Sequence, residues 1–276
     1  MSDASTVGNR FEDRRELRTV ATPEQAYRAW ADPSIIQGWF ADEAEGEAVP
    51  GGTLVFRFPD FGLSYPLEVI EAKSPERLVL RMSFPGRPPV TQEIVVRTDS
   101  GETVIELTNS GFGEEEWDGQ WAGIDSGWRM AFAQLAHYLE QWFGRRRTTY
   151  LAMRPAHFTW DRLCDLQRRG DLLEQWLVQS GTMGAASPLD ERGRSVSLAL
   201  RDMTHLSGHV LEVTDRELIV SWQEMEGTLE LKGFAMGPQT RMVGLRMSSW
   251  SAAPPAHALV TGWMNGALER LGALTS

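Results

Sequence analysis

The stretch from Trp128 to Phe143 limits most strongly what this chain can fold into. At 3.6 residues per turn, five large apolar residues of this stretch fall on one stripe of an α-helix. They follow one another at intervals of three or four positions: Trp128, Phe132, Leu135, Leu139 and Trp142. We therefore expect a long helix that buries one apolar face, with Met130 and His137 pointing away from that face and His137 in solvent.

The chain before this helix alternates like an antiparallel sheet. In the segment 53–58, Leu54, Phe56 and Phe58 fall on one face of a strand. The other strands expected in this half are 14–20, 65–72, 78–84, 90–97 and 103–108. Thr22 followed by Pro23 is typical of a helix start, and a second short helix is expected at 34–40. This pattern predicts an α+β fold in which a long helix closes an antiparallel sheet, an arrangement that usually encloses a cavity.

The second half of the chain repeats this order of elements. Strands are expected at 195–201, 209–214, 217–223, 228–234 and 241–247, and a final helix at 256–274. Val69 matches Val210 and Trp128 matches Trp263, at offsets of 141 and 135 positions. We therefore predict a duplication with two domains, residues 1–147 and residues 148–276, the second being a degenerate copy of the first.

Composition and charge exclude several classes of partner. The net charge is −11, and residues 1–147 hold 24 acidic and 15 basic side chains. Neither half has the basic excess that binding to nucleic acid or to an anionic membrane surface requires. No stretch approaches the ~18 apolar residues of a membrane span, the start lacks a secretory pattern, and Cys164 is the only cysteine. These features predict a cytoplasmic protein without disulfides.

Residues typical of catalysis or metal binding form no recognisable pattern. His205 and His209 have a metal-ligand spacing only in a helix, whereas they lie in a strand-like region where four residues span about 13 Å. We find no nucleophile motif, no phosphate-binding loop and no paired carboxylates, so we expect no metal and no cofactor.

The unusual feature of the composition is the aromatic content, with 11 tryptophans. Core packing is the simpler explanation for any one of them, and an aromatic binding pocket is the alternative.

Residues 10–143 resemble a known family. They are similar to bacterial homologues of the Aha-type activators of the heat-shock protein 90 ATPase, within the START/birch-pollen-allergen superfamily of helix-grip domains. The residues that carry the resemblance are 22–30, Asp32-Pro33, Gly38-Trp39-Phe40, Gly51-Gly52, 75–78, Ser110-Gly111-Phe112 and Gly127-Trp128. The resemblance implies a sheet that grips the long helix around a cavity. Because the superfamily holds ligand carriers, cyclases and co-chaperones, it does not imply one chemistry.

These arguments together predict two tandem helix-grip domains and a ligand cavity in the first. The residues expected to line it are Trp39, Phe56, Phe58, Tyr65, Phe84, Trp117, Trp121, Trp128 and Phe132. Trp128 and Phe132 are expected at the wide end, and Leu139 and Trp142 at the narrow end. The leading hypothesis is non-enzymatic binding of an apolar small molecule. The alternatives are a co-chaperone-like module that binds a chaperone, and, with least support, a cyclase- or hydrolase-like enzyme.

Overall fold

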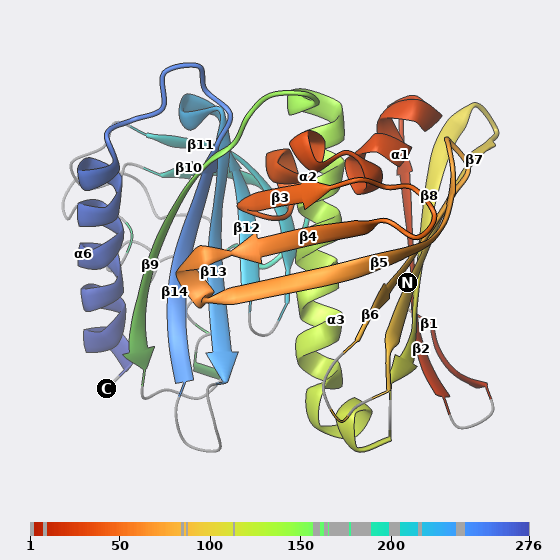
Figure 1. The fold of residues 1–276 in the computed structure, drawn as a ribbon. Helices are drawn as coiled ribbons and strands as arrows, with labels where there is room; N and C mark the ends of the chain where they lie inside the picture. Colours follow the sequence, from red (N-terminus) through yellow and green to blue (C-terminus); the bar gives the residue numbers. More distant parts are fainter. Residues whose placement is uncertain are drawn as a thin grey trace. The chain divides into compact units, whose positions relative to one another are not determined.

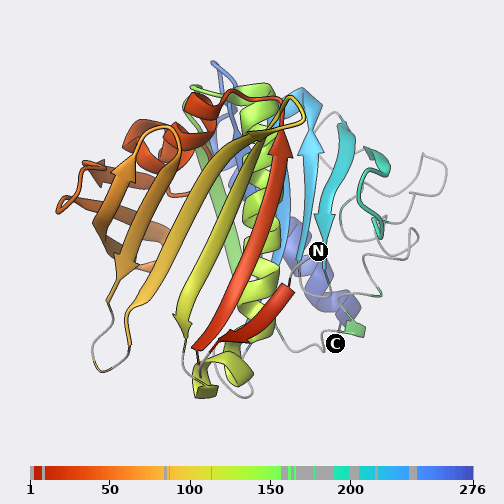
Figure 2. The ribbon, with the colours of Figure 1, turned by 90° about the vertical axis from the view of Figure 1, so that its right-hand side faces the viewer.

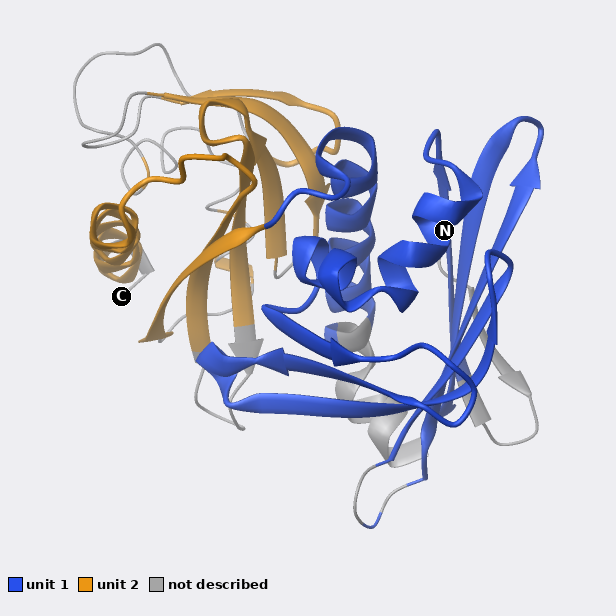
Figure 3. Cartoon of the chain, turned by 45° about the horizontal axis from the view of Figure 1, so that its top comes forward, with its two compact units in different colours: residues 1–146 blue, residues 147–276 orange. Residues whose placement is uncertain are grey.

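The chain divides into two compact units, residues 1–146 and 147–276 (Figure 3). The computed structural model describes residues 3–7, 10–83, 86, 88–112, 114–156, 161–162, 165, 177, 189–198, 205–214, 217–235 and 241–275. Within these ranges, the side chains of 3–7, 10–11, 114–122, 124, 156, 234–235, 241 and 274–275 are not described. The two units are treated separately below.

The first unit is built on an eight-stranded antiparallel sheet with the order β1-β2-β8-β7-β6-β5-β4-β3. Its strands are β1 (Asp3–Val7), β2 (Arg10–Thr19), β3 (Glu43–Gly46), β4 (Thr53–Phe58), β5 (Leu63–Lys73), β6 (Arg77–Met82), β7 (Val90–Asp99) and β8 (Glu102–Phe112). Figures 1 and 2 show the sheet curving, with the long helix α3 (Glu114–His137) lying against one face. The first main strand, β2, pairs with the last, β8.

Two short helices connect β2 to β3. Helix α1 (Pro23–Ala31) begins as predicted, since the Thr22 hydroxyl accepts a hydrogen bond from the backbone N–H of Gln25 and Pro23 is its first residue. Asp32 ends α1 and its side chain caps α2 (Pro33–Trp39). These local contacts fix the turn that brings the buried side chains of both helices onto the interior of the unit.

Helix α3 is covered on more sides than the predicted stripe. Its buried residues lie all around its axis: Met130, Phe132, Ala133, Gln134, Leu135, Tyr138 and Leu139, the last two in the π-helical turn Tyr138–Trp142. The prediction that Met130 and His137 point away from the core was therefore wrong. Because α2 lies against Tyr138, the helix meets a second layer on a side that the stripe alone leaves open.

His137 is one of the residues that this enclosure removes from water. The indole Nε1 of Trp142 donates a hydrogen bond to His137 Nε2 at 3.1 Å. Since Nε2 accepts this bond, the neutral ring carries its proton on Nδ1. Burial lowers the pKa of His137 to about 4. The residue is therefore neutral in the fold at pH 7.

The second unit has a six-stranded antiparallel sheet with the order β10-β11-β12-β13-β14-β9. Its strands are β9 (Thr148–Ala156), β10 (Ser195–Leu198), β11 (Leu206–Val213), β12 (Glu217–Trp222), β13 (Gly227–Ala235) and β14 (Arg241–Ser249), and helix α6 (His257–Thr275) follows β14. Figure 1 shows α6 running along β9. The predicted fold class is thus confirmed: an α+β chain of two helix-grip units in tandem.

The two sheets share two topological details. In each, the first main strand pairs with the last, β2 with β8 and β9 with β14. Each also has a register shift at the same place, between Val69 and Glu71 in β5 and between Val210 and Glu212 in β11. Val69 and Val210 are the pair that the sequence matched at an offset of 141 positions. A shared bulge is a specific feature, since bulges bend a strand at one defined point.

No helix in the described part of the chain has the length and apolar character needed to cross a membrane.

The contact between α2 and α3 gives a prediction with a matched control. A Cβ atom added to Gly38 would overlap the ring of Tyr138, which is fully buried, whereas one added to Gly127 in α3 meets no described atom within 4 Å. Gly38→Ala should therefore destabilise the protein by about 1–3 kcal/mol through overpacking, despite the better helix propensity of alanine. Gly127→Ala should stabilise it by about 0.5–1 kcal/mol. Urea unfolding of both variants is the measurement, and equal shifts would contradict the proposed contact.

His137 gives a prediction on pH. Its pKa in the fold is lower than the ~6.5 of an unfolded histidine, so its neutral form is favoured and stability falls as pH drops from about 6.5 toward 4. In His137→Gln, which keeps an acceptor for Trp142 but does not titrate, the loss of unfolding free energy between pH 7 and pH 4.5 should be smaller by about 2 kcal/mol. The exposed His209→Gln serves as control. If the parent and His137→Gln lost equal stability, the burial of a neutral histidine would be refuted.

Candidate functional site

The interior of the first unit holds a buried layer of aromatic rings. Trp30, Trp39, Phe56 and Phe132 are between 2% and 8% exposed. Trp30 lies at the centre, with its ring 5.0 Å from that of Trp39 and 6.2 Å from that of Phe132. The indole of Trp39 donates to the carbonyl of Ala29 at 2.7 Å, while the indole nitrogen of Trp30 finds no acceptor among the described residues. These rings fill the space between α1, α2, the sheet and α3.

A second set of rings forms a continuous row that is only half-buried. Tyr65 contacts Phe58, Phe58 contacts Phe40, and Phe40 stacks on Trp128, with ring centroids 6.1, 5.6 and 6.0 Å apart. The planes of Phe40 and Trp128 are within 5° of parallel. All four rings are partly exposed, unlike the layer beneath them. The row runs from β5 and β4 through the end of α2 to α3, so it forms one aromatic surface at the edge of the core.

Six of the nine predicted site residues belong to these two layers. Trp39, Phe56 and Phe132 are in the buried layer, and Phe58, Tyr65 and Trp128 are in the half-buried row. Phe40 and Trp30, which complete the layers, were not among them. Phe84 lies outside the described residues, as do the side chains of Trp117 and Trp121, whose backbone belongs to α3.

A buried charged cluster lies in the same interior, at the β2–β8 side. The Nη2 atom of Arg15 is 2.8 Å from Asp13 Oδ1 and 2.9 Å from Asp125 Oδ1, and its Nε donates to Asp13 Oδ2 at 3.2 Å. Asn109, which pairs with Asp13 across the two strands, donates from Nδ2 to Asp13 Oδ2 at 3.4 Å. The cluster links the sheet to α3 through Arg15 and Asp125.

Sequence reasoning did not find this cluster. Strand β2 carries charged residues on both of its faces, since Glu12, Arg14 and Glu16 alternate with Asp13 and Arg15. A strand with one face in solvent normally has apolar residues on the other face. Charges at consecutive positions of β2 were therefore an available signal that charged side chains enter the interior.

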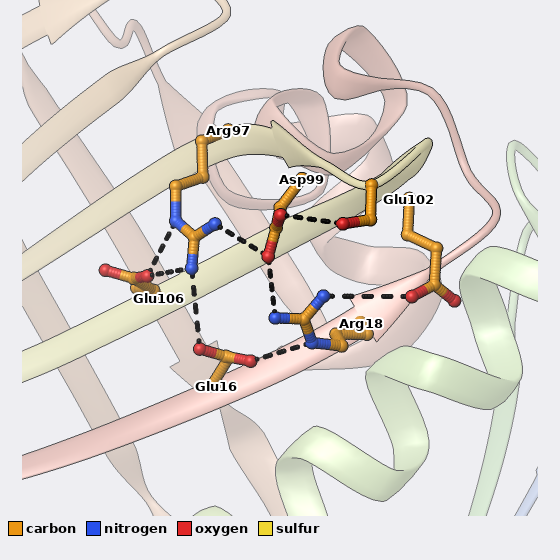
Figure 4. A network of polar contacts seen from close by, with 7 residues as sticks. Glu16, Arg18, Arg97, Asp99, Glu102 and Glu106 are labelled. Carbon is orange, nitrogen blue, oxygen red and sulfur yellow. Dashed lines mark hydrogen bonds and ion pairs between the residues drawn. The ribbon is translucent and has the colours of Figure 1, made fainter.

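The outer face of the same strands carries a network of exposed ion pairs (Figure 4). Arg18 contacts Glu16 at 3.0 Å and Asp99 at 2.9 Å, and Arg97 contacts Glu106 at 2.8 Å and Asp99 at 3.4 Å. Hydrogen bonds from Arg18, then Ser100 and Arg97, hold the pKa of Asp99 below its usual value. The carboxylates outnumber the guanidinium groups in this network, so this face remains acidic.

The interior of the second unit is different, because it is mainly aliphatic. Its core includes leucine and valine residues from every strand from β10 to β14. A cavity of about 10 Å³ lies among them, lined only by leucine and valine side chains such as Leu189, Leu206 and Leu245. That volume corresponds to about one water molecule, and it cannot hold an organic ligand. Among the described residues, no cluster of three or more histidine, cysteine or acidic side chains could bind a metal.

Several solved structures resemble the chain. They include the solution structure of the Aha1 dimer from Colwellia psychrerythraea, with 19% identity, covering 47% of this chain and 96% of that one at a TM-score of 0.42. CalU16 from Micromonospora echinospora has 20% identity, covering 50% and 83%, at a TM-score of 0.41. DynU16, from the dynemicin biosynthetic locus, has 17% identity, covering 96% and 99%, at a TM-score of 0.43. No curated protein matches the chain.

A family model gives the more specific result. The model described as "Activator of Hsp90 ATPase homolog 1-like protein" matches residues 20–140. This range runs from the start of α1 to the end of α3, and it contains the half-buried row of rings. Residues 20–140 are therefore similar to Activator of Hsp90 ATPase homolog 1-like proteins, which confirms the resemblance predicted from the sequence.

Proposed function

We propose that the first unit binds an apolar small molecule without transforming it. The observation that carries this proposal is the half-buried row Tyr65–Phe58–Phe40–Trp128, in which each ring contacts the next. Aromatic surface that is continuous, partly exposed and next to a packed core is typical of a binding site for flat apolar groups. The buried layer beneath supports the row, so the rings are held in place before a ligand arrives.

The location of the row also supports binding from the side of α2 and β4. Phe40 is the last ring before β3 and touches three partners, Trp39, Phe56 and Phe58, in addition to Trp128. A residue with so many ring contacts has few free rotamers, so little entropy is lost when a ligand covers it. The ligand expected here is therefore flat and apolar, and it stacks on the row rather than entering the buried layer.

A second candidate function is a co-chaperone-like interaction with a chaperone. It is favoured by the family match over residues 20–140 and by the acidic outer face with its network around Arg18 and Arg97. An acidic face can steer a basic partner protein. This candidate is tested by measuring whether the protein stimulates the ATPase of a bacterial heat-shock protein 90. Stimulation without binding of any apolar probe would favour it over the leading proposal.

We also propose that residues 148–276 are a degenerate copy of residues 1–147 that holds no ligand. The shared strand order and the bulge at Val69 and Val210 support common descent. The aliphatic interior with its cavity of about 10 Å³ supports the absence of a ligand in the second unit. In this arrangement, ligand binding is a property of the first unit, where the aromatic row lies.

The proposed ligand site predicts the effect of removing one ring. Phe58→Leu keeps an apolar side chain but removes the aromatic contact with both Tyr65 and Phe40. Binding of the neutral fluorescent probe N-phenyl-1-naphthylamine should weaken about two- to tenfold, which corresponds to about 0.5–1.5 kcal/mol for an aromatic pair. The measurement is a fluorescence titration of the parent and the variant.

Phe143→Leu is the matched control for this experiment. Phe143 is also half-buried, and its ring lies 6.0 Å from that of Tyr138, which is not part of the row. The control should bind the probe like the parent. Absence of probe binding in the parent, or equal weakening in both variants, would count against the aromatic row as the ligand site.

A further inference from the structure

The buried charged cluster of the first unit is not electrically balanced. Among the described residues, its ionic groups are two carboxylates, Asp13 and Asp125, which share the guanidinium of Arg15. The side chain of Asp13 is 0% exposed and that of Arg15 is 6% exposed. Asp13 and Arg15 balance each other, so the formal charge of −1 falls on Asp125, whose side chain is 26% exposed and can be reached by an additional cation.

One neutral atom of the cluster is also left without a partner. Asn109 is 1% exposed, and its Oδ1 accepts no hydrogen bond from any described residue. The amide is oriented by Asp13, because only the NH₂ group can donate to a carboxylate. Oδ1 is thereby fixed as an acceptor in the interior. Leaving such a group unsatisfied costs about 1–3 kcal/mol, which a donor on a ligand would recover.

The cluster is close along α3 to the aromatic row. Asp125 and Trp128 are three residues apart, so they lie on neighbouring positions of one helix face with a rise of about 5 Å between them. The side chain of Asp125 is 26% exposed, whereas Asp13 is fully enclosed. Asp125 is thus the most exposed of the three ionic groups, and its position on α3 neighbours that of Trp128, which ends the row.

From this juxtaposition we propose that the first unit recognises an aromatic amine. The flat part of the ligand lies on the row at Trp128, and its protonated amine lies at the cluster, donating to Asn109 Oδ1 and to the carboxylates of Asp13 and Asp125. The amine supplies the missing positive charge and the missing donor together. This inference rests on the proposed ligand binding, and it adds the chemical class of the ligand.

Three probes of similar size test the proposal on the full-length protein. They are 1-naphthylmethylamine, which is a cation at pH 7, the neutral 1-naphthalenemethanol, and the anion 1-naphthaleneacetate. Isothermal titration calorimetry should show the amine binding at least tenfold more tightly than the alcohol, and the carboxylate binding most weakly. Equal affinities for the amine and the alcohol would overturn the amine proposal and leave the aromatic site standing. No binding of any probe would overturn both.

Asp125→Asn is the variant that isolates the charge. It preserves the size and a contact for Arg15 while it removes one carboxylate, so the amine should lose its tenfold advantage and the alcohol should bind as before. Asp60→Asn removes the same charge from an exposed position and should keep the preference. If Asp60→Asn reduced the preference as much as Asp125→Asn, the effect would be long-range and the proposal would be wrong.

Asn109→Leu tests the unsatisfied acceptor Asn109 Oδ1 separately. Since Asn109 is buried, the fold of the variant is first checked by circular dichroism and by urea unfolding. A folded Asn109→Leu should bind the amine at least fivefold more weakly than the parent. Unchanged amine affinity in this variant would exclude Asn109 from the site. If Asp125→Asn also kept the preference for the amine over the alcohol, the cluster would not be the amine site. If Asn109→Leu did not fold, the comparison of Asp125→Asn with Asp60→Asn would decide.

Discussion

The enclosure of α3 is the constraint on which the first unit depends. A helix whose buried residues surround its axis needs partners on more than one side, and here the sheet provides one and α2 another. The approach of α2 requires a residue without a side chain at Gly38, where the ring of Tyr138 lies. The same approach places Phe40, at the end of α2, against Trp128 on α3. A packing requirement at one position therefore determines where the aromatic row meets α3.

Much of this fold could be predicted because its patterns are local. The strand at 53–58 and the start of α1 at Thr22-Pro23 follow from alternation and capping, which depend on neighbouring residues. Strand β9 could not be found in this way. Its sequence contains alanine and methionine, which favour helices, and its strand state depends on pairing with β14, which lies about ninety residues away. The edge strands β1 and β3 were missed for a similar reason, since they are short and depend on one partner each.

The candidate site, too, could be predicted only in part. Aromatic residues are rare and large, so their positions in the sequence already pointed to the interior, and Trp39, Phe56 and Phe132 are buried there. The charged part was missed because a charged residue is normally assigned to solvent. Asp13 becomes fully buried only because Asn109 lies opposite it on β8 and Asp125 approaches from α3. These are long-range contacts, and no window of sequence around Asp13 contains them.

The two interiors also show why one unit is the better candidate for binding. An interior of leucine and valine can adjust its rotamers until nearly all space is filled, and the cavity among these side chains in the second unit has a volume of about 10 Å³. Rigid rings and paired charges adjust less, because rings have flat shapes and charges require fixed partners. Among the described residues, Asn109 Oδ1 and the indole nitrogen of Trp30 are unsatisfied in the first unit, and the indole nitrogen of Trp263 is unsatisfied in the second. An unsatisfied polar atom reduces the stability of the empty protein, and a ligand that donates to Asn109 Oδ1 binds more tightly for that reason.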